Sequence, residues 1–121
     1  MAAKVKDGVF IHVSHGENPH RVLMALSMAD QMSEDKDVLV YFDIKGVEVP
    51  LKDAQERKFG NFTSSKTLLQ KLIDNGVHLY ACPACLEAAG KKPEDLMDGV
   101  KIADKQAFFD FTQGRILNFS Y

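Results

Sequence analysis

The residues of this sequence with the clearest chemical potential are its two cysteines, Cys82 and Cys85. Cys82 directly follows the apolar run 77–81, which has the length of a buried strand, and Pro83 after it suits the first turn of a helix. A sulfur placed where a strand ends and a helix begins faces unpaired backbone amides and the positive end of the helix dipole. Both lower the pKa of a thiol and favour the thiolate, which attacks sulfur or binds metal. The pattern therefore indicates a reactive thiol at Cys82.

The second cysteine, Cys85, lies three residues further on and faces roughly the same side of the expected helix. We take it as a second catalytic candidate. Free cysteines are also common as small apolar core residues, and the neighbouring Leu86 is compatible with that role. Two cysteines so close together cannot join distant parts of the chain, which excludes a disulfide framework.

Polar residues follow the other expected strands and form the remainder of the candidate site. Ser14, His15 and Glu17 come after the first strand, and Asp43 comes directly after the second. Ligands and catalytic groups gather beyond the carboxyl ends of parallel strands, so we expect these four residues to contribute to binding. His15 is expected to approach Cys82 and stabilise its thiolate. The sequence suggests no resident cofactor and no metal ligand set.

Strand and helix patterns alternate along the chain and place these residues at one edge of a sheet. The expected strands cover 9–13, 38–42, 77–81, 100–103 and 116–119, and the expected helices cover 19–32, 63–75, 83–89 and a segment after Asp104. Between residues 46 and 60 the pattern is weaker, and we expect an extended piece over 47–50 and a helical turn through Ala54 and Phe59. The fold class is therefore α/β: a mainly parallel five-stranded sheet with helices on both faces.

Length and composition limit the classes of function. A chain of 121 residues is long enough for one ordinary domain, here 1–121, and too short for two. A net charge of -2 gives no excess of basic residues to neutralise nucleic acid or an anionic membrane surface, so neither is expected as a partner. No apolar run is long enough to span a bilayer, and the first residues lack the apolar stretch of a signal peptide. We therefore expect a cytoplasmic protein.

Two segments of the chain resemble a known family when they are taken in order and spacing. The first runs from Val13 through the loop 14–18 into the helix that contains 25–29. The second runs from Gly76 to Cys82 and continues through Gly90 to the turn 94–100, which reads Glu-Asp-Leu-Met-Asp-Gly-Val. Together they resemble the DsrE/DsrF-like (DsrE/TusD-type) sulfur-relay family. The resemblance covers nearly the whole chain and is weakest between residues 47 and 63.

This resemblance implies a fold, a function and an assembly state, and the implied fold is a doubly wound α/β sheet. Sulfur-relay members of the family carry sulfur as a persulfide on a cysteine, and the matching position here is Cys82. It also implies a homo-oligomer, a trimer or a hexamer, that exchanges sulfur with donor and acceptor proteins. Cys85 departs from the single-cysteine pattern and leaves its role open, functional or structural. We therefore expect a sulfur carrier or sulfurtransferase that uses Cys82 as the sulfur-accepting thiolate.

Two functions from other classes remain open. A dithiol redox protein would use Cys82 and Cys85 together, although the order of the surrounding elements is unlike that of a thioredoxin fold. A non-enzymatic oligomeric binding module is the other possibility, with a metal on the cysteines and a histidine as one variant, but a single cysteine pair is a weak zinc signal. His12 and His78 lie inside strands and are expected to be structural rather than ligands.

Overall fold

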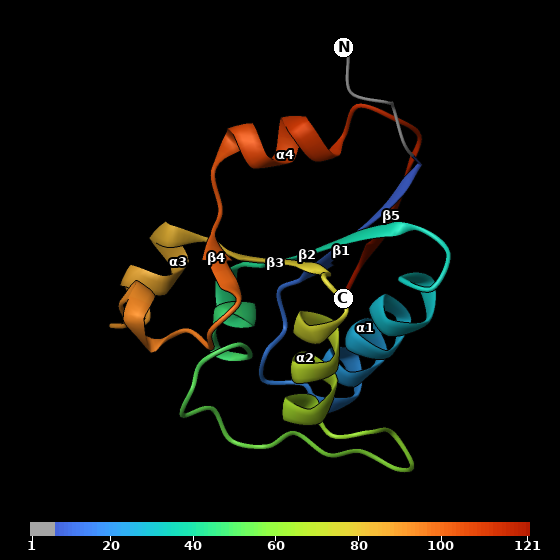
Figure 1. The fold of residues 1–121 in the computed structure, drawn as a ribbon. Coiled ribbons are helices and arrows are strands. Elements are labelled where there is room, and N and C mark those ends of the chain that lie inside the picture. The colour runs from blue at the N-terminus through green and yellow to red at the C-terminus, as the bar shows by residue number, and fades with distance from the viewer. Residues whose placement is uncertain (1–6) are drawn as a thin grey trace.

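A computed structural model of the chain describes residues 7–121 and contains one sheet of five parallel strands (Figure 1). In chain order the strands are β1 (Gly8–Val13), β2 (Asp37–Phe42), β3 (His78–Ala81), β4 (Val100–Ile102) and β5 (Ile116–Ser120). Across the sheet their order is β4-β3-β2-β1-β5. The chain therefore runs outward from β1 to β4 and then returns to the other side of β1. This topology confirms the predicted doubly wound parallel sheet.

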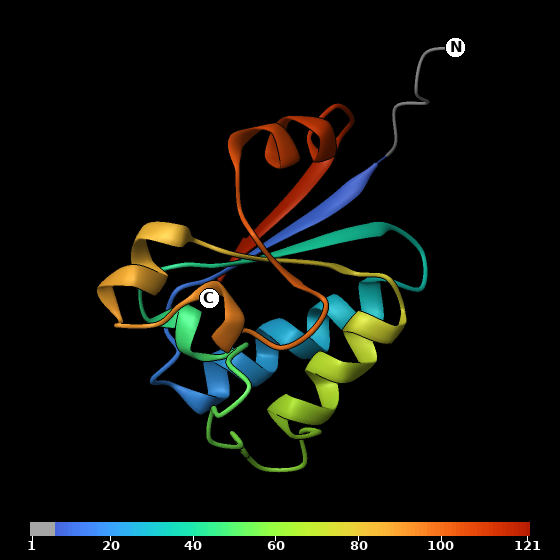
Figure 2. The ribbon, with the colours of Figure 1, turned by 60° about the vertical axis from the view of Figure 1, so that its left-hand side comes forward.

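Helices cover both faces of the sheet. On one side lie α1 (Pro19–Met32) and α2 (Ser65–Asp74), and on the other lies α4 (Lys105–Phe111), while α3 (Pro83–Ala88) leaves the carboxyl end of β3 (Figures 1 and 2). Local sequence signals explain where α1 and α4 begin. The Asn18 side chain accepts the backbone amide of Arg21 at 3.1 Å, and the Asp104 side chain accepts that of Ala107 at 2.8 Å. Between residues 7 and 121, no helix combines the length and apolar character needed to cross a membrane.

The main core lies between the sheet and the α1/α2 layer. Alternate residues of β1 and β2 point into it, because successive side chains of a strand face opposite sides. The buried members from these strands and from the two helices include Val9, Ile11, Val13, Val38, Val40, Phe42, Val22, Leu26, Leu69 and Leu72. Continuous burial of this kind gives the sheet a rigid base from which the loops at its carboxyl edge extend.

The opposite face, beneath α4, is less completely covered and richer in aromatic and polar groups. Phe10 and His12 of β1, Tyr41 of β2 and Tyr80 of β3 all point to this side and are only partly buried. Phe108 of α4 contacts these rings, with its centroid 4.8 Å from that of Tyr41. No residue of α4 is fully buried. This face therefore leaves titratable side chains within reach of solvent.

The predicted secondary structure between residues 46 and 60 is wrong in two places. In place of an extended piece, the chain forms a short 3-10 helix, η1 (Ile44–Glu48). In place of a helical turn through Ala54 and Phe59, residues 53–59 contain no helix, and hydrogen bonds to neighbouring segments hold the loop instead. Arg57 Nε donates to the carbonyl of Gly16 at 2.8 Å, and Glu56 Oε1 accepts the amide of Lys66 at 2.7 Å. Tertiary contacts thus decide the conformation where local apolar spacing is weak. The turn predicted near Pro93 is present as η2 (Pro93–Asp95).

Candidate functional site

Cys82 lies at the carboxyl edge of the sheet, where β3 passes into α3. Its backbone amide donates to the carbonyl of Phe42 at 2.8 Å, which extends the β2–β3 pairing by one residue. The residue has an extended conformation (φ -66°, ψ 121°) and is the N-cap of α3, with Pro83 in the first turn. Its side chain is partly exposed and the thiol is free. The strand end therefore fixes the sulfur at a boundary between packed sheet and solvent.

The strand register places three further side chains on the same face as this sulfur. Tyr41 pairs with His12 on β1 and with Tyr80 on β3. Two residues further along each strand, Asp43 and Cys82 therefore stand side by side on that face. His12, Tyr41, Asp43 and Cys82 thus form a polar cluster on the α4 side of the carboxyl edge, and we call these four residues the edge cluster.

The surroundings of Cys82 lower the pKa of its thiol below the ordinary value. Burial acts in the opposite direction and raises the pKa. This is outweighed by the backbone amide of Cys85, the Tyr41 hydroxyl, the Cys85 thiol and the backbone amide of Ala84. Because Cys82 makes no strict side-chain capping bond to α3 and that helix has only six residues, the stabilisation comes from these individual groups rather than from a large helix dipole. Cys82 therefore ionises more readily than an ordinary cysteine thiol.

Cys85 has the opposite electrostatic character. Its thiol is also free and partly exposed, but burial and the nearby Cys82 sulfur raise its pKa, against a lowering by the backbone amide of Ile44. Ile44 itself has a left-handed backbone (φ 52°) and a side chain that is 62% exposed. A β-branched residue rarely adopts this conformation, because its Cβ crowds the backbone. The strained turn after β2 therefore directs a backbone amide toward the second cysteine.

His12 and Asp43 make a short side-chain hydrogen bond within the edge cluster. His12 Nε2 lies 2.6 Å from Asp43 Oδ1, and both side chains are partly buried. The His12 ring stacks on Tyr41, with the two ring centroids 5.8 Å apart and the planes inclined by 19°. His12 therefore contacts both Asp43, which the sequence placed in the candidate site, and Tyr41. This histidine was expected to be structural.

The three residues predicted after β1 lie elsewhere on this edge. Ser14 Oγ is 3.2 Å from His15 Nδ1, and Arg21 Nη1 is 3.3 Å from both ring nitrogens of His15. His15 and Glu17 are exposed. His15 thus contacts the first turn of α1, and neither cysteine is among its hydrogen-bond partners in the described part of the chain.

Sequence reasoning missed Tyr41, His12 and Ile44 as members of this site. Tyr41 and His12 read as ordinary strand residues, and their proximity to Cys82 depends on the register between β1, β2 and β3. The alternation of polar His12 between buried Ile11 and Val13 was the available signal. Nothing in the sequence marks the left-handed conformation of Ile44, since that conformation favours glycine or asparagine.

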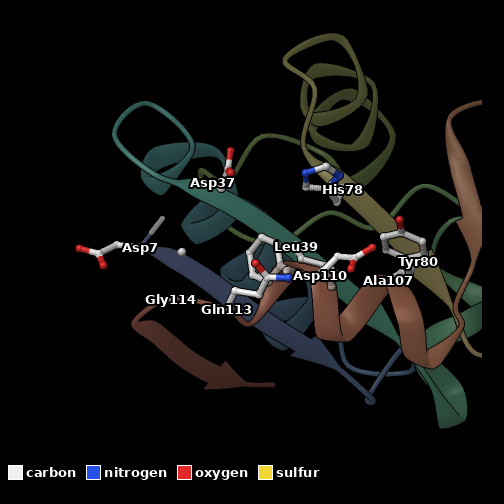
Figure 3. A pocket seen from close by; sticks show the side chains of 11 residues that line it. Asp7, Asp37, Leu39, His78, Tyr80, Ala107, Asp110, Gln113 and Gly114 are labelled. Atoms are coloured by element: carbon white, nitrogen blue, oxygen red, sulfur yellow. The ribbon is translucent and has the colours of Figure 1, made fainter. Parts of the chain in front are cut away.

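A cavity of about 340 Å³ opens at the other end of the sheet. Its lining includes Asp37 and His78 at the starts of β2 and β3, together with Tyr80 and, on α4, Asp110 and Phe111 (Figure 3). It lies at the amino edge of the strands and contains neither cysteine. Within residues 7–121 no group of three or more His, Cys, Asp or Glu side chains is arranged to hold a metal ion.

Comparisons with known proteins connect this geometry to a family. The fold is similar to that of MTH1491, a protein of unknown function from Methanobacterium thermoautotrophicum, with 20% identity and a TM-score of 0.71 over 93% of this chain and 98% of that one. It is also similar to the ychN protein from E. coli, with 19% identity and a TM-score of 0.64 over 96% of this chain and 100% of that one. Among curated proteins, no sequence matches. The DsrE/DsrF-like family model matches residues 7–119, nearly the whole length. The chain therefore belongs to the DsrE/DsrF-like family, which is generally connected with sulfur relay.

Proposed function

We propose that this protein carries sulfane sulfur as a persulfide on Cys82, receiving it from a donor and passing it to the thiol of an acceptor protein. The observation that supports this most directly is the environment of Cys82: a partly exposed thiol at the end of β3 whose pKa is lowered by the amide of Cys85 and the hydroxyl of Tyr41. A thiolate at neutral pH is the nucleophile that such chemistry requires.

The transfer is two successive exchanges at sulfur. The Cys82 thiolate attacks the terminal sulfur of a donor persulfide, the donor S–S bond breaks, and the donor leaves as a thiolate while Cys82 becomes a persulfide. A thiolate of the acceptor then attacks the outer sulfur, the bond within the Cys82 persulfide breaks, and Cys82 returns to its thiolate. Each exchange moves one sulfur atom and needs no external oxidant or reductant.

A dithiol function is the second candidate, because the two cysteine sulfurs influence each other's ionisation. A Cys85 thiolate could attack the inner sulfur of the Cys82 persulfide, forming a disulfide and releasing hydrosulfide. The raised pKa of Cys85 keeps it mainly as the thiol at neutral pH, which slows this attack. The electrostatics therefore favour carriage over dithiol chemistry.

The carrier function requires partners, and we include them in the proposal. Donor and acceptor must bring a sulfur atom to the carboxyl edge, where the exposed side chain of Ile44 offers an apolar rim beside the cysteines. A trimer or hexamer remains our expectation for the assembly, with exposed Phe109 and Leu117 as apolar side chains available for subunit contacts. Light scattering of the purified protein measures the assembly state directly.

Intact-mass measurement after exposure to polysulfide tests the proposed function. The unaltered chain and Cys85→Ala should gain one sulfur atom that dithiothreitol removes, and Cys82→Ser should gain none. Reversible loss of two hydrogens that requires both cysteines would instead establish the dithiol function. If no variant gains sulfur or forms a disulfide, both candidates are excluded.

A further inference from the structure

Tyr41 is a titratable residue of the edge cluster whose hydroxyl helps to lower the pKa of Cys82, and the two exchange steps above give it no part in attack or release. Its ring is held on two sides: His12 stacks against it at 5.8 Å between centroids, and Phe108 of α4 meets it edge-on at 4.8 Å and 81°. The register with β3 places its side chain on the same face as Cys82. The ring is therefore fixed on the face that carries the sulfur, and Cys82 is the diagonal neighbour of Tyr41 across the β2–β3 pair, a separation that an aromatic side chain can reach.

We propose that Tyr41 is a catalytic hydrogen-bond donor to the Cys82 sulfur, which stabilises the thiolate both when it attacks and when it leaves. This inference rests on the proposed function. In loading, the hydrogen bond lowers the basicity of the attacking sulfur and raises the thiolate population. In release, the same thiolate is the leaving group, and a leaving thiolate of lower pKa departs faster. One O–H group would thus assist both directions of the relay without transferring its proton.

The environment of Tyr41 suits a permanent donor. Burial, the interaction with Cys82 and the charge of Asp43 all raise the pKa of the phenol, with burial the largest cause. The hydroxyl therefore stays protonated throughout the range in which Cys82 titrates. The negative charge of Asp43 opposes loss of that proton, and the 2.6 Å contact to His12 holds the carboxylate in place.

Other charged groups face this edge and have to remain constant in a test. Asp43 and, through it, His12 approach from β2 and β1, and Cys85 approaches from α3. Lys101 and Asp104 approach from the β4 side, and both are exposed. The Asp104 carboxylate accepts a backbone amide of the first turn of α4. Replacing Tyr41 by phenylalanine alters none of these charges and keeps the ring that packs on Phe108.

The test compares thiol ionisation in Tyr41→Phe and Tyr80→Phe, both in a Cys85→Ser background so that only one thiol reacts. Tyr80 is the matched control, since it is the register partner of Tyr41 and also packs near Phe108, at 6.5 Å between centroids. The rate of iodoacetamide alkylation is measured between pH 5 and pH 10. We expect the midpoint for Tyr41→Phe to move up by about one pH unit, the effect of losing one hydrogen bond to a charged group. We expect no movement for Tyr80→Phe, and an equal midpoint in the two variants overturns the inference.

A second measurement on the unsubstituted ring covers the case in which Tyr41→Phe fails to fold. The chain has only three tyrosines, so ¹³Cζ labelling resolves Tyr41, Tyr80 and Tyr121. The Tyr41 signal should titrate with the alkylation midpoint of Cys82 and the other two should not, and a Tyr41 signal that ignores the thiol overturns the inference.

These readouts do not require sulfur transfer, so the two proposals fail separately. If the protein never gains sulfur but Tyr41→Phe moves the alkylation midpoint, the carrier function is lost and the hydrogen bond stands. If sulfur loads normally, release to glutathione should be about threefold to tenfold slower in Tyr41→Phe, because the leaving thiolate is more basic. Loading and release equal to those of Tyr80→Phe would remove the catalytic role of Tyr41 and leave Cys82 as the carrier.

Discussion

Gly46 provides a sharp test of how the loop after β2 is held against the loop after β1. A Cβ added at Gly46 would lie 1.9 Å from the carbonyl oxygen of Val13, 2.7 Å from its carbonyl carbon and 3.3 Å from the Cα of Ser14. All three atoms are backbone, so no side chain can rotate away. The φ angle of Gly46 is not left-handed, so alanine itself would adopt this conformation without strain. The whole cost of Gly46→Ala therefore comes from contact.

The size of that cost follows from what must move. Forcing one extra carbon into a packed site costs about 1–3 kcal/mol. The carbonyl of Val13 also accepts the amide of Asp43 at 3.1 Å, and losing this backbone hydrogen bond costs about 1 kcal/mol more. We therefore expect Gly46→Ala to lower the free energy of unfolding by about 2–4 kcal/mol, and Tm by roughly 8–15 °C for a domain of this length.

Urea unfolding followed by far-UV circular dichroism measures the loss, and Gly76→Ala is the matched control. A Cβ at Gly76 meets no atom within 4 Å, but the residue has φ +77°, so its alanine variant suffers only backbone strain of about 1 kcal/mol. Both substitutions add the same methyl group and restrict the unfolded chain equally. If Gly46→Ala costs no more than Gly76→Ala, the two loops are not in close contact and the reasoning about the turn that carries Asp43 is refuted.

Three further substitutions test the contacts that hold α1, α2 and the loop between η1 and α2. Asn18→Ala removes the cap of α1 and should lower the free energy of unfolding by about 1 kcal/mol in urea melts, whereas Asn18→Asp should retain it. The pKa of Glu56 is lowered, mainly by the amide of Lys66, so its charge stabilises the fold above the ordinary carboxyl pKa and this contribution disappears as pH falls. Glu56→Gln should therefore flatten the loss of stability between pH 6 and pH 3, and an unchanged pH profile would contradict the assignment. Arg57 is partly buried, which lowers its pKa, and its Nε donates to the Gly16 carbonyl and so holds the loop. Arg57→Met should therefore speed limited proteolysis of residues 52–64 severalfold, whereas the control Lys58→Met should leave the rate unchanged.

The regular elements were predictable because their signals are local. The apolar runs that became β1, β2 and β3 agree with the structure to within one residue at either end. Asn18 and Asp104 cap the helices that follow them, as their side chains and positions indicate. The placement of Cys82 at the junction of β3 and α3 needed only the order of strand, cysteine and proline. Features set by a few neighbouring residues can thus be derived from sequence.

The composition of the edge cluster was not predictable, because it depends on pairing between distant segments. Asp43 was expected in the site, but its partner His12 lies 31 residues away in sequence and reaches it only through the register of β1 and β2. His15 was expected to approach Cys82, and the structure instead pairs it with Arg21 at the start of α1. A shift of one residue in register would turn every one of these side chains to the other face, and the sequence contains no local signal for it.

The position of the site in this fold depends on how β1 and β5, the two strands at the topological switch point, are joined at their ends. In doubly wound sheets the usual crevice lies where the chain reverses direction across the sheet, here between β1 and β5. Backbone hydrogen bonds bridge that point: Ser14 donates to the carbonyl of Tyr121 at 2.8 Å, and Tyr121 donates to that of His12 at 2.7 Å. The ends of β1 and β5 therefore stay joined and leave no gap between them. The junction of β3 and α3 lies on the same edge and presents the backbone amides of Ala84 and Cys85 to the sulfur of Cys82.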